Sequence, residues 1–99
     1  MYKVFGSPVL TIIRNSENRI ELNAMSSKES PIKKLTLSIK DISFSKDFSY
    51  DEKTNRYSLS IDTEESLTLK AGNYYYDLDV FYEDESSEVE SYSAKIVIQ

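Results

Sequence analysis

Apolar and polar side chains alternate along most of this chain, and short polar turns separate the alternating stretches. Residues 33–40 show the pattern most clearly, because Leu35, Leu37 and Ile39 share one face and the polar residues between them share the other. Alternation with a period of two places successive side chains on opposite faces of a strand. We therefore expect a half-buried strand here, with Thr36 among the residues that face water.

The same pattern recurs along the chain, in residues 9–13, 19–23, 57–61, 74–82 and 89–99, and less regularly in 42–48. We expect 9–13 and 19–23 to form a hairpin, residues 50–56 to form a charged turn, and Thr63 to begin a single helical turn. About seven strands at intervals of roughly ten residues are typical of a β-sandwich. The sequence therefore predicts an all-β fold, an immunoglobulin-like antiparallel sandwich, as one domain over residues 1–99.

The segment from Leu69 to Tyr74 carries the most specific local signal, with Gly72 two residues before the tyrosine that opens the longest expected strand. This spacing is typical of a tyrosine corner, in which the tyrosine hydroxyl donates to backbone a few residues upstream. Glycine suits such a corner because the backbone turns tightly or approaches a neighbour closely. We expect Leu69, Gly72 and Tyr74 to pin the crossing between the two sheets.

The composition excludes most catalytic chemistry. The chain contains no cysteine and no histidine, so it lacks thiolate ligands, disulfides and the commonest general base. A serine nucleophile needs an adjacent base, and the two glycines are too few for a phosphate-binding loop. We therefore expect a non-enzymatic protein with no catalytic residue and no cofactor.

Aromatic and acidic residues gather between residues 74 and 90. Sugar-stacking tyrosines, a protein interface or a calcium site are all compatible with such a group, although no EF-hand pattern is present. A solvated, aggregation-resistant strand edge is the simplest interpretation. The candidate interaction surface comprises Tyr75, Asp77, Asp79, Phe81, Tyr82, Glu83, Asp84, Glu85, Glu88 and Glu90.

Charge is unevenly distributed along the chain, with a net +4 in residues 1–40 and a net −9 in residues 41–99. Such an asymmetry can orient a protein on a charged partner or on a second copy of itself. Solvated strand faces and loops explain it more simply. The basic residues Lys28, Lys33 and Lys34 are sparse and lack interleaved aromatic residues, so direct nucleic-acid binding is not expected.

The N-terminal stretch predicts a first strand rather than a signal peptide, because Gly6, Ser7 and Pro8 interrupt it and no small-residue cleavage site follows. No apolar run reaches the roughly 18 residues that a membrane-spanning helix needs. We expect a protein that is made in a cytoplasm and has no membrane partner.

Residues 57–61 (Tyr-Ser-Leu-Ser-Ile) and 69–78 (Leu-Lys-Ala-Gly-Asn-Tyr-Tyr-Tyr-Asp-Leu) resemble small bacteriophage virion proteins. The similar proteins are the N-terminal domains of baseplate upper proteins and related head-fibre or tail accessory domains. There, a strand and a Thr-Leu-Lys-Gly-x-Tyr-x-Tyr-Asp corner precede a last hairpin that ends in an apolar strand. This chain departs from the pattern where residues 83–88 replace a glycine turn, and at Ser93, where a glycine is frequent.

The resemblance implies a phage structural or accessory protein that docks onto capsid, tail or baseplate proteins through strand edges and surface patches. It implies a location in the virion or the host cytoplasm, and it leaves a homo-oligomer open. A small acidic inhibitor that mimics nucleic acid toward a basic host protein is an alternative, favoured by the acid-only stretch from Asp77 to Glu90. A carbohydrate-binding or adhesion module that uses outward tyrosines is a further alternative.

Overall fold

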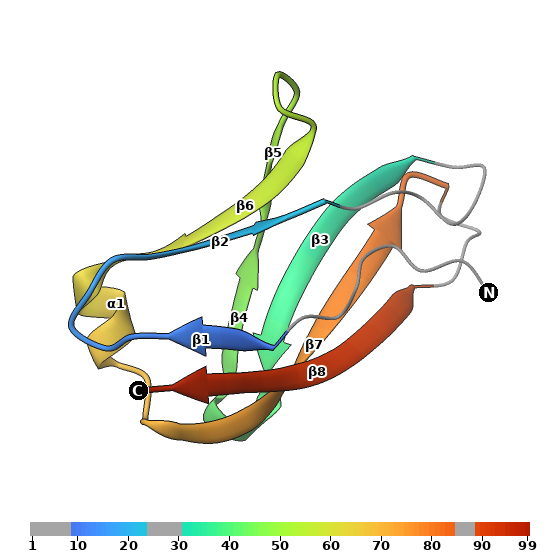
Figure 1. Ribbon diagram of the computed structural model, residues 1–99. Coiled ribbons are helices and arrows are strands. Elements are labelled where there is room, and N and C mark those ends of the chain that lie inside the picture. The colour runs from blue at the N-terminus through green and yellow to red at the C-terminus, as the bar shows by residue number, and fades with distance from the viewer. Residues whose placement is uncertain (1–8, 24–30, 85–88) are drawn as a thin grey trace.

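The computed structural model describes residues 9–23, 31–84 and 89–99, in which eight strands form two sheets that pack against each other (Figure 1). The larger sheet has the strand order β1–β8–β7–β3–β4, and the smaller sheet has the order β2–β6–β5. The predicted sandwich is confirmed, with eight strands where about seven were expected. The strands are β1 (Leu10–Ile12), β2 (Asn18–Leu22), β3 (Ile32–Ile39), β4 (Phe44–Asp47), β5 (Ser49–Asp51), β6 (Arg56–Ile61), β7 (Gly72–Tyr82) and β8 (Glu90–Ile98).

The strands β1 and β2 do not form the expected hairpin. Strand β1 pairs in parallel with β8, with Leu10 opposite Ile96, whereas β2 pairs antiparallel with β6. The loop between β1 and β2 carries the chain from one sheet to the other, and Asn18 closes it with hydrogen bonds to the Ile13 amide and carbonyl, both 2.9 Å long. The prediction was wrong because Ile12 and Ile20 enter the core from opposite sheets, which the two strands of one hairpin cannot do.

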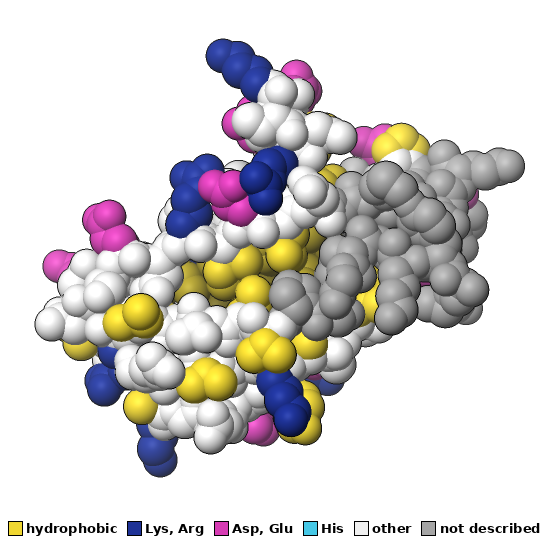
Figure 2. Space-filling model, viewed as in Figure 1, with side chains coloured by type: hydrophobic (Ala, Val, Ile, Leu, Met, Phe, Trp, Pro, Cys, Tyr) yellow, Lys and Arg dark blue, Asp and Glu magenta, His cyan; other side chains and the backbone are white. Residues whose placement is uncertain are grey.

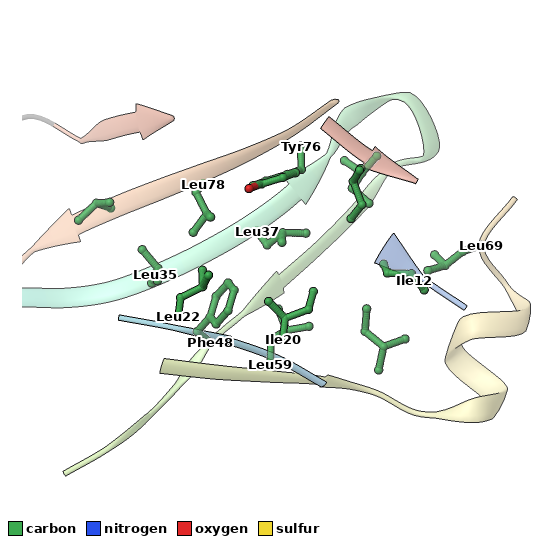
Figure 3. Close-up of a cluster of buried hydrophobic side chains, with 14 of the residues drawn as sticks. Ile12, Ile20, Leu22, Leu35, Leu37, Phe48, Leu59, Leu69, Tyr76 and Leu78 are labelled. Atoms are coloured by element: carbon green, nitrogen blue, oxygen red, sulfur yellow. The ribbon is translucent and has the colours of Figure 1, made fainter. Parts of the chain in front are cut away.

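The hydrophobic core lies between the two sheets and takes the inward residues of both (Figure 3). The predicted inward faces of residues 33–40, 57–61 and 74–82 are confirmed by burial. A fully buried aliphatic side chain contributes roughly 1.5–3 kcal/mol relative to an exposed one. The side chains drawn together in the close-up include Ile12, Ile20, Leu22, Leu35, Leu37, Phe48, Leu59, Leu69, Tyr76 and Leu78.

Thr36 is buried, with 8% of its surface exposed, although it was expected to face water. It stands on β3 opposite Asp79 of β7 on one side and Asp47 of β4 on the other. Its hydroxyl donates to Asp47 Oδ1 at 2.7 Å. Because the longer side chains of two neighbouring strands flank it, this outward threonine loses contact with water, and strand periodicity alone cannot predict that.

The segment expected to be a charged turn forms most of a hairpin. Tyr50 lies in β5 opposite Tyr57 in β6, and their ring centroids are 4.9 Å apart. Residues 52–55 make the turn itself, with Asn55 at a φ of 55°. The hairpin projects beyond the larger sheet (Figure 1), which explains why its residues are so polar.

Two short helical segments connect the strands, η1 (Lys40–Ile42) and α1 (Thr63–Leu67). The N-cap of α1 is Asp62 rather than Thr63, because the Asp62 carboxylate accepts from the Glu65 amide at 2.7 Å. Within the described ranges, no helix is long and apolar enough to cross a membrane.

The tyrosine corner is confirmed at the entry to β7. The Tyr74 hydroxyl donates to the Lys70 carbonyl at 3.0 Å, and Leu69 is buried beside it. Gly72 has a φ of 156°, and a Cβ atom there would lie 3.1 Å from the Tyr74 hydroxyl oxygen. Glycine is therefore favoured at position 72 by the backbone conformation, and a side chain there would press against the Tyr74 ring.

Candidate functional site

The outward face of β7 carries four side chains that were predicted to form an interaction surface, namely Tyr75, Asp77, Asp79 and Phe81. Strands β8 and β3 flank β7, so this face belongs to the middle of the larger sheet. Tyr75 is 64% exposed, whereas the other three side chains are only partly exposed. Of these four outward side chains, Tyr75 is therefore the one that is most accessible to a partner.

The carboxylates of Asp77 and Asp79 are engaged by neighbours on the same sheet. Ser93 Oγ donates to Asp77 Oδ1 and Ser91 Oγ donates to Asp79 Oδ1, each at 2.5 Å. Lys40 Nζ lies 3.6 Å from Asp77 Oδ2. Contacts between directly opposite residues of paired strands stabilise a sheet. The contacts of these two aspartates therefore stabilise the pairing of strands within the larger sheet.

Phe81 is covered by a neighbouring cation. Lys34 stands opposite Phe81 on β3, and its Nζ lies 4.5 Å from the centroid of the ring. This cation–π contact occupies one face of the ring. Phe81 is therefore a poorer stacking platform than its outward position on the strand suggested.

Tyr82 was predicted to be part of the interaction surface, but it is only 5% exposed and points into the core. Its hydroxyl donates to Glu90 Oε1, and Glu90 is itself partly buried at the start of β8. The interaction surface predicted from the sequence is corrected here. Tyr82 follows the inward alternation of β7, which continues to the end of the strand.

Two further acids of the predicted surface, Glu83 and Asp84, lie where β7 ends. Glu83 and Asp84 are exposed there, and the Glu83 amide donates to the Pro31 carbonyl at 3.0 Å. Glu85 and Glu88 lie outside the described residues. In the described part of the chain, no group of three or more acidic side chains is placed to hold a metal ion.

Three tyrosines have raised pKa values. Burial raises the pKa of Tyr76 to about 12. Burial also raises the pKa of Tyr57, with a smaller contribution from Tyr50, and the pKa of Tyr92, with smaller contributions from Glu90 and Tyr82. These phenols are therefore neutral at physiological pH and are poor bases and nucleophiles.

A second surface lies at one corner of the larger sheet, where β1 meets β8 and β7. Because Leu10 and Ile12 point inward, Val9 and Ile13 point outward, and they are 65% and 51% exposed. Figure 2 shows hydrophobic side chains set singly among other residues over β1 and the adjoining end of β8, with a Lys or Arg side chain beside them. We call this surface the β1–β8 corner, and it comprises Val9, Ile13, Asn73, Tyr75, Lys95 and Val97.

A shallow hollow of about 380 Å³ lies in the β1–β8 corner. Tyr75 stands opposite Lys95 in the β7–β8 pairing, and Asn73 stands opposite Val97. The hollow thus combines aliphatic walls, one exposed aromatic ring, one amide and one ammonium group. Its lining residues are Val9, Asn73, Tyr74, Tyr75, Lys95, Ile96 and Val97.

Of the residues at this corner, only Tyr75 was predicted from the sequence to belong to an interaction surface. Val9 and Ile13 were assigned to an apolar hairpin strand, because the run from Val9 to Ile13 is apolar on both faces. Such a run is typical of a strand covered on both faces. Instead, β1 carries it at the end of the sheet, and its outward face is exposed. The signal in the sequence that could have revealed the corner was an apolar run too short for a central strand, because the outward apolar residues of a short edge strand stay exposed.

The fold resembles known β-sandwich modules. It superposes with a TM-score of 0.54 and 15% sequence identity on a chain from the structures of Clostridium thermocellum CbhA fibronectin(III)-like modules. The similarity covers 96% of this chain but 44% of that chain, so this chain spans less than half of its length. The protein is accordingly a two-sheet sandwich of the fibronectin type III-like, immunoglobulin-like class. No family model and no curated protein matches the sequence.

Proposed function

We propose that this protein is a non-enzymatic docking module that binds another protein through the β1–β8 corner. The observation that carries the proposal is the hollow of about 380 Å³ that the exposed Val9 and Tyr75 line together with Lys95 and Val97. A hollow that combines apolar side chains with a few polar groups is typical of a binding surface. The sandwich behind the corner is well packed, so the surface is held ready without a folding step on binding.

We further propose that the docking partner is a component of a bacteriophage particle. The support is the resemblance of residues 57–61 and 69–78 to small virion proteins. Such a protein has a structural or accessory role on capsid, tail or baseplate, and it needs a stable scaffold and one adhesive surface rather than a catalytic site.

The two alternative functions have less support from the geometry. A nucleic-acid mimic requires a continuous acidic surface, but the outward face of the larger sheet mixes both signs of charge. A sugar platform of Tyr75, Phe81 and Tyr82 is reduced to Tyr75, since Lys34 covers Phe81 and Tyr82 is buried. The charged residues on that outward face are Asp47, Asp77, Asp79, Lys34, Lys40 and Lys95.

Mass spectrometry of purified phage particles from a producing culture, with the free lysate measured alongside, tests the proposal. We expect the chain in particles in a fixed ratio to the major capsid or tail proteins. Detection of the chain only in the free lysate would contradict the virion assignment. Particles produced with Tyr75→Ser should contain less of the chain, whereas Tyr50→Ser, which changes an exposed tyrosine on the β5–β6 hairpin, should leave the ratio unchanged.

A further inference from the structure

Lys95 differs from Lys34 and Lys40, which contact residues on the outward face of β7. Lys40 lies near Asp77, and Lys34 lies over the ring of Phe81. Within the described ranges, no acidic side chain lies within ion-pair distance of Lys95, which stands beside the hollow and opposite Tyr75. The positive charge of the β1–β8 corner is therefore available to a partner.

We infer that the β1–β8 corner recognises an extended protein segment in which a carboxylate lies next to aliphatic side chains. The inference rests on the docking function proposed above and specifies the chemistry of the partner. The carboxylate pairs with Lys95, and the aliphatic side chains pack on Tyr75, Val9 and Val97. Asn73 offers one amide donor and one acceptor at the same hollow, which suits the backbone of an extended segment.

The composition of the hollow favours a peptide over a sugar. Sugar sites surround an aromatic ring with several hydrogen-bonding groups, because each hydroxyl of the ligand must be satisfied when it loses water. Here the outward side chains that line the hollow with Tyr75 are the aliphatic Val9 and Val97 and only two polar ones, Asn73 and Lys95. A hollow of about 380 Å³ is enough to receive one or two side chains.

The charge of Lys95 makes the expected binding sensitive to salt. An exposed ion pair is screened over about 8 Å at physiological ionic strength. Reversal of the charge replaces attraction by repulsion, and we expect this to weaken binding by about tenfold or more. Loss of the Tyr75 ring should weaken binding by a similar factor, because tyrosine is enriched among the residues that contribute most to binding at interfaces.

The test begins with a library of displayed random peptides, selected on the full-length folded protein. The peptides enriched most strongly are synthesised, together with versions in which each Glu or Asp is replaced by Gln or Asn. Their dissociation constants are measured by fluorescence anisotropy on the wild type and on Lys95→Glu and Tyr75→Ser. The matched controls are Lys53→Glu and Tyr50→Ser, two changes of the same kind on the β5–β6 hairpin. Thermal melts verify that all four variants fold.

We expect the enriched peptides to share an acidic residue next to aliphatic residues. They should bind about tenfold more weakly to Lys95→Glu and to Tyr75→Ser, and about equally to the two controls. Replacement of the acidic residue should weaken binding to the wild type but strengthen binding to Lys95→Glu, because it removes the repulsion between the two carboxylates there.

Several outcomes overturn the inference. These are the absence of enriched peptides, enriched peptides without acids, and equal losses in the variants and their controls. Glycan binding that Tyr75→Ser abolishes would make a sugar the ligand. If the protein dimerises and Lys95→Glu abolishes the dimer, the corner binds a second copy of the chain. If peptides bind only after residues 1–8 are removed, the corner binds the N-terminal segment of the chain itself. Incorporation into particles without peptide binding would remove the inference and leave the proposed function standing. Peptide binding without incorporation would leave the inference and the docking function standing and would remove the phage assignment.

Discussion

At the scale of single residues, Gly72 and Tyr74 act as one unit at the entry to β7. The Tyr74 ring lies over the backbone of Gly72 so closely that a Cβ atom there would approach the ring to between 3.1 and 3.3 Å. The hydroxyl of the same ring reaches the Lys70 carbonyl. The turn from α1 into the larger sheet therefore depends on a residue without a side chain and on a hydroxyl group.

The corner hydrogen bond leads to a prediction for Tyr74→Phe. We expect the free energy of unfolding to fall by about 0.5–1.5 kcal/mol, as is usual when one hydrogen bond is lost. Lys70 is exposed, so water replaces part of the bond and a larger loss is not expected. Urea denaturation measures the change. Tyr75→Phe is the matched control, because that hydroxyl is on an exposed side chain and its removal should cost less than about 0.5 kcal/mol. Equal decreases in the free energy of unfolding in the two variants would show that the hydrogen bond between Tyr74 and Lys70 does not stabilise the fold.

Burial of Tyr76 predicts how stability depends on pH. Its pKa is raised from 10.0 to about 12 in the folded protein, so folding favours the neutral phenol. The resulting stabilisation is complete below pH 10 and is lost as the pH rises from 10 through 12. Tyr57 and Tyr92 act in the same direction. Urea denaturation across this range should show falling stability, and the dependence should be shallower in Tyr76→Phe. An equally steep dependence in that variant would exclude Tyr76 as its source.

At the scale of elements, α1 is a helix that its surroundings hold in place. Five residues are too few for a helix to be stable alone. Ser66 is fully buried, accepts from the Asn15 amide at 3.0 Å and donates to the Thr63 carbonyl at 2.7 Å. Lys46 of β4 reaches Glu65 at 2.7 Å, which joins the larger sheet to the helix. The helix thereby ties the loop between β1 and β2 to both sheets.

The cap of α1 gives a second prediction for stability. Asp62→Ala should lower the free energy of unfolding by about 0.5–2 kcal/mol, because the Glu65 amide loses its side-chain acceptor. Asp62→Asn keeps an oxygen acceptor and should retain most of the stability. Thr63→Ala serves as the control and should change stability by less than about 0.5 kcal/mol. A larger decrease in the free energy of unfolding for Thr63→Ala than for Asp62→Ala would show that Thr63 is the N-cap.

At the scale of the whole molecule, a shared core makes the two sheets unfold together. Leu37 is fully buried between them, whereas Leu67 of α1 is 46% exposed. We expect Leu37→Ala to cost about 2–5 kcal/mol and Leu67→Ala to cost much less. Circular dichroism and tyrosine fluorescence should give coincident denaturation curves for all variants. Separate transitions from the two probes would show that the sheets are independent units.

The whole fold also redistributes the charge asymmetry of the chain. Lys34 and Lys40 come from the basic half of the sequence, and they lie beside Phe81 and Asp77 of the acidic half. Pairing of β3 with β7 brings the two halves together on one face. Lys95 stands at the β1–β8 corner away from this mixture, so the charge at the surface that we propose for docking is a single lysine rather than the excess seen along the sequence.

The sequence by itself determined most of the strands and most of their buried faces, although β5 was expected to be part of a turn. Leu35, Leu37 and Ile39 show this, because a period of two follows from backbone geometry and needs no knowledge of neighbours. The spacing of Leu69, Gly72 and Tyr74 was equally informative, since the corner closes within a few residues. A candidate surface followed from the same alternation, and Tyr75 is the member that proved well exposed.

Only the tertiary structure decided which strands are neighbours and what covers each outward face. The pairing of Leu10 with Ile96 joins opposite ends of the chain, and no local pattern encodes it. Thr36 is buried by side chains from β4 and β7, and Phe81 is covered by Lys34 of β3. The β1–β8 corner exists because three strands far apart in sequence meet there. Local periodicity determines on which face of a strand a side chain lies. Whether that side chain is exposed depends on the neighbouring strands, and these are set by pairing between segments far apart in the sequence.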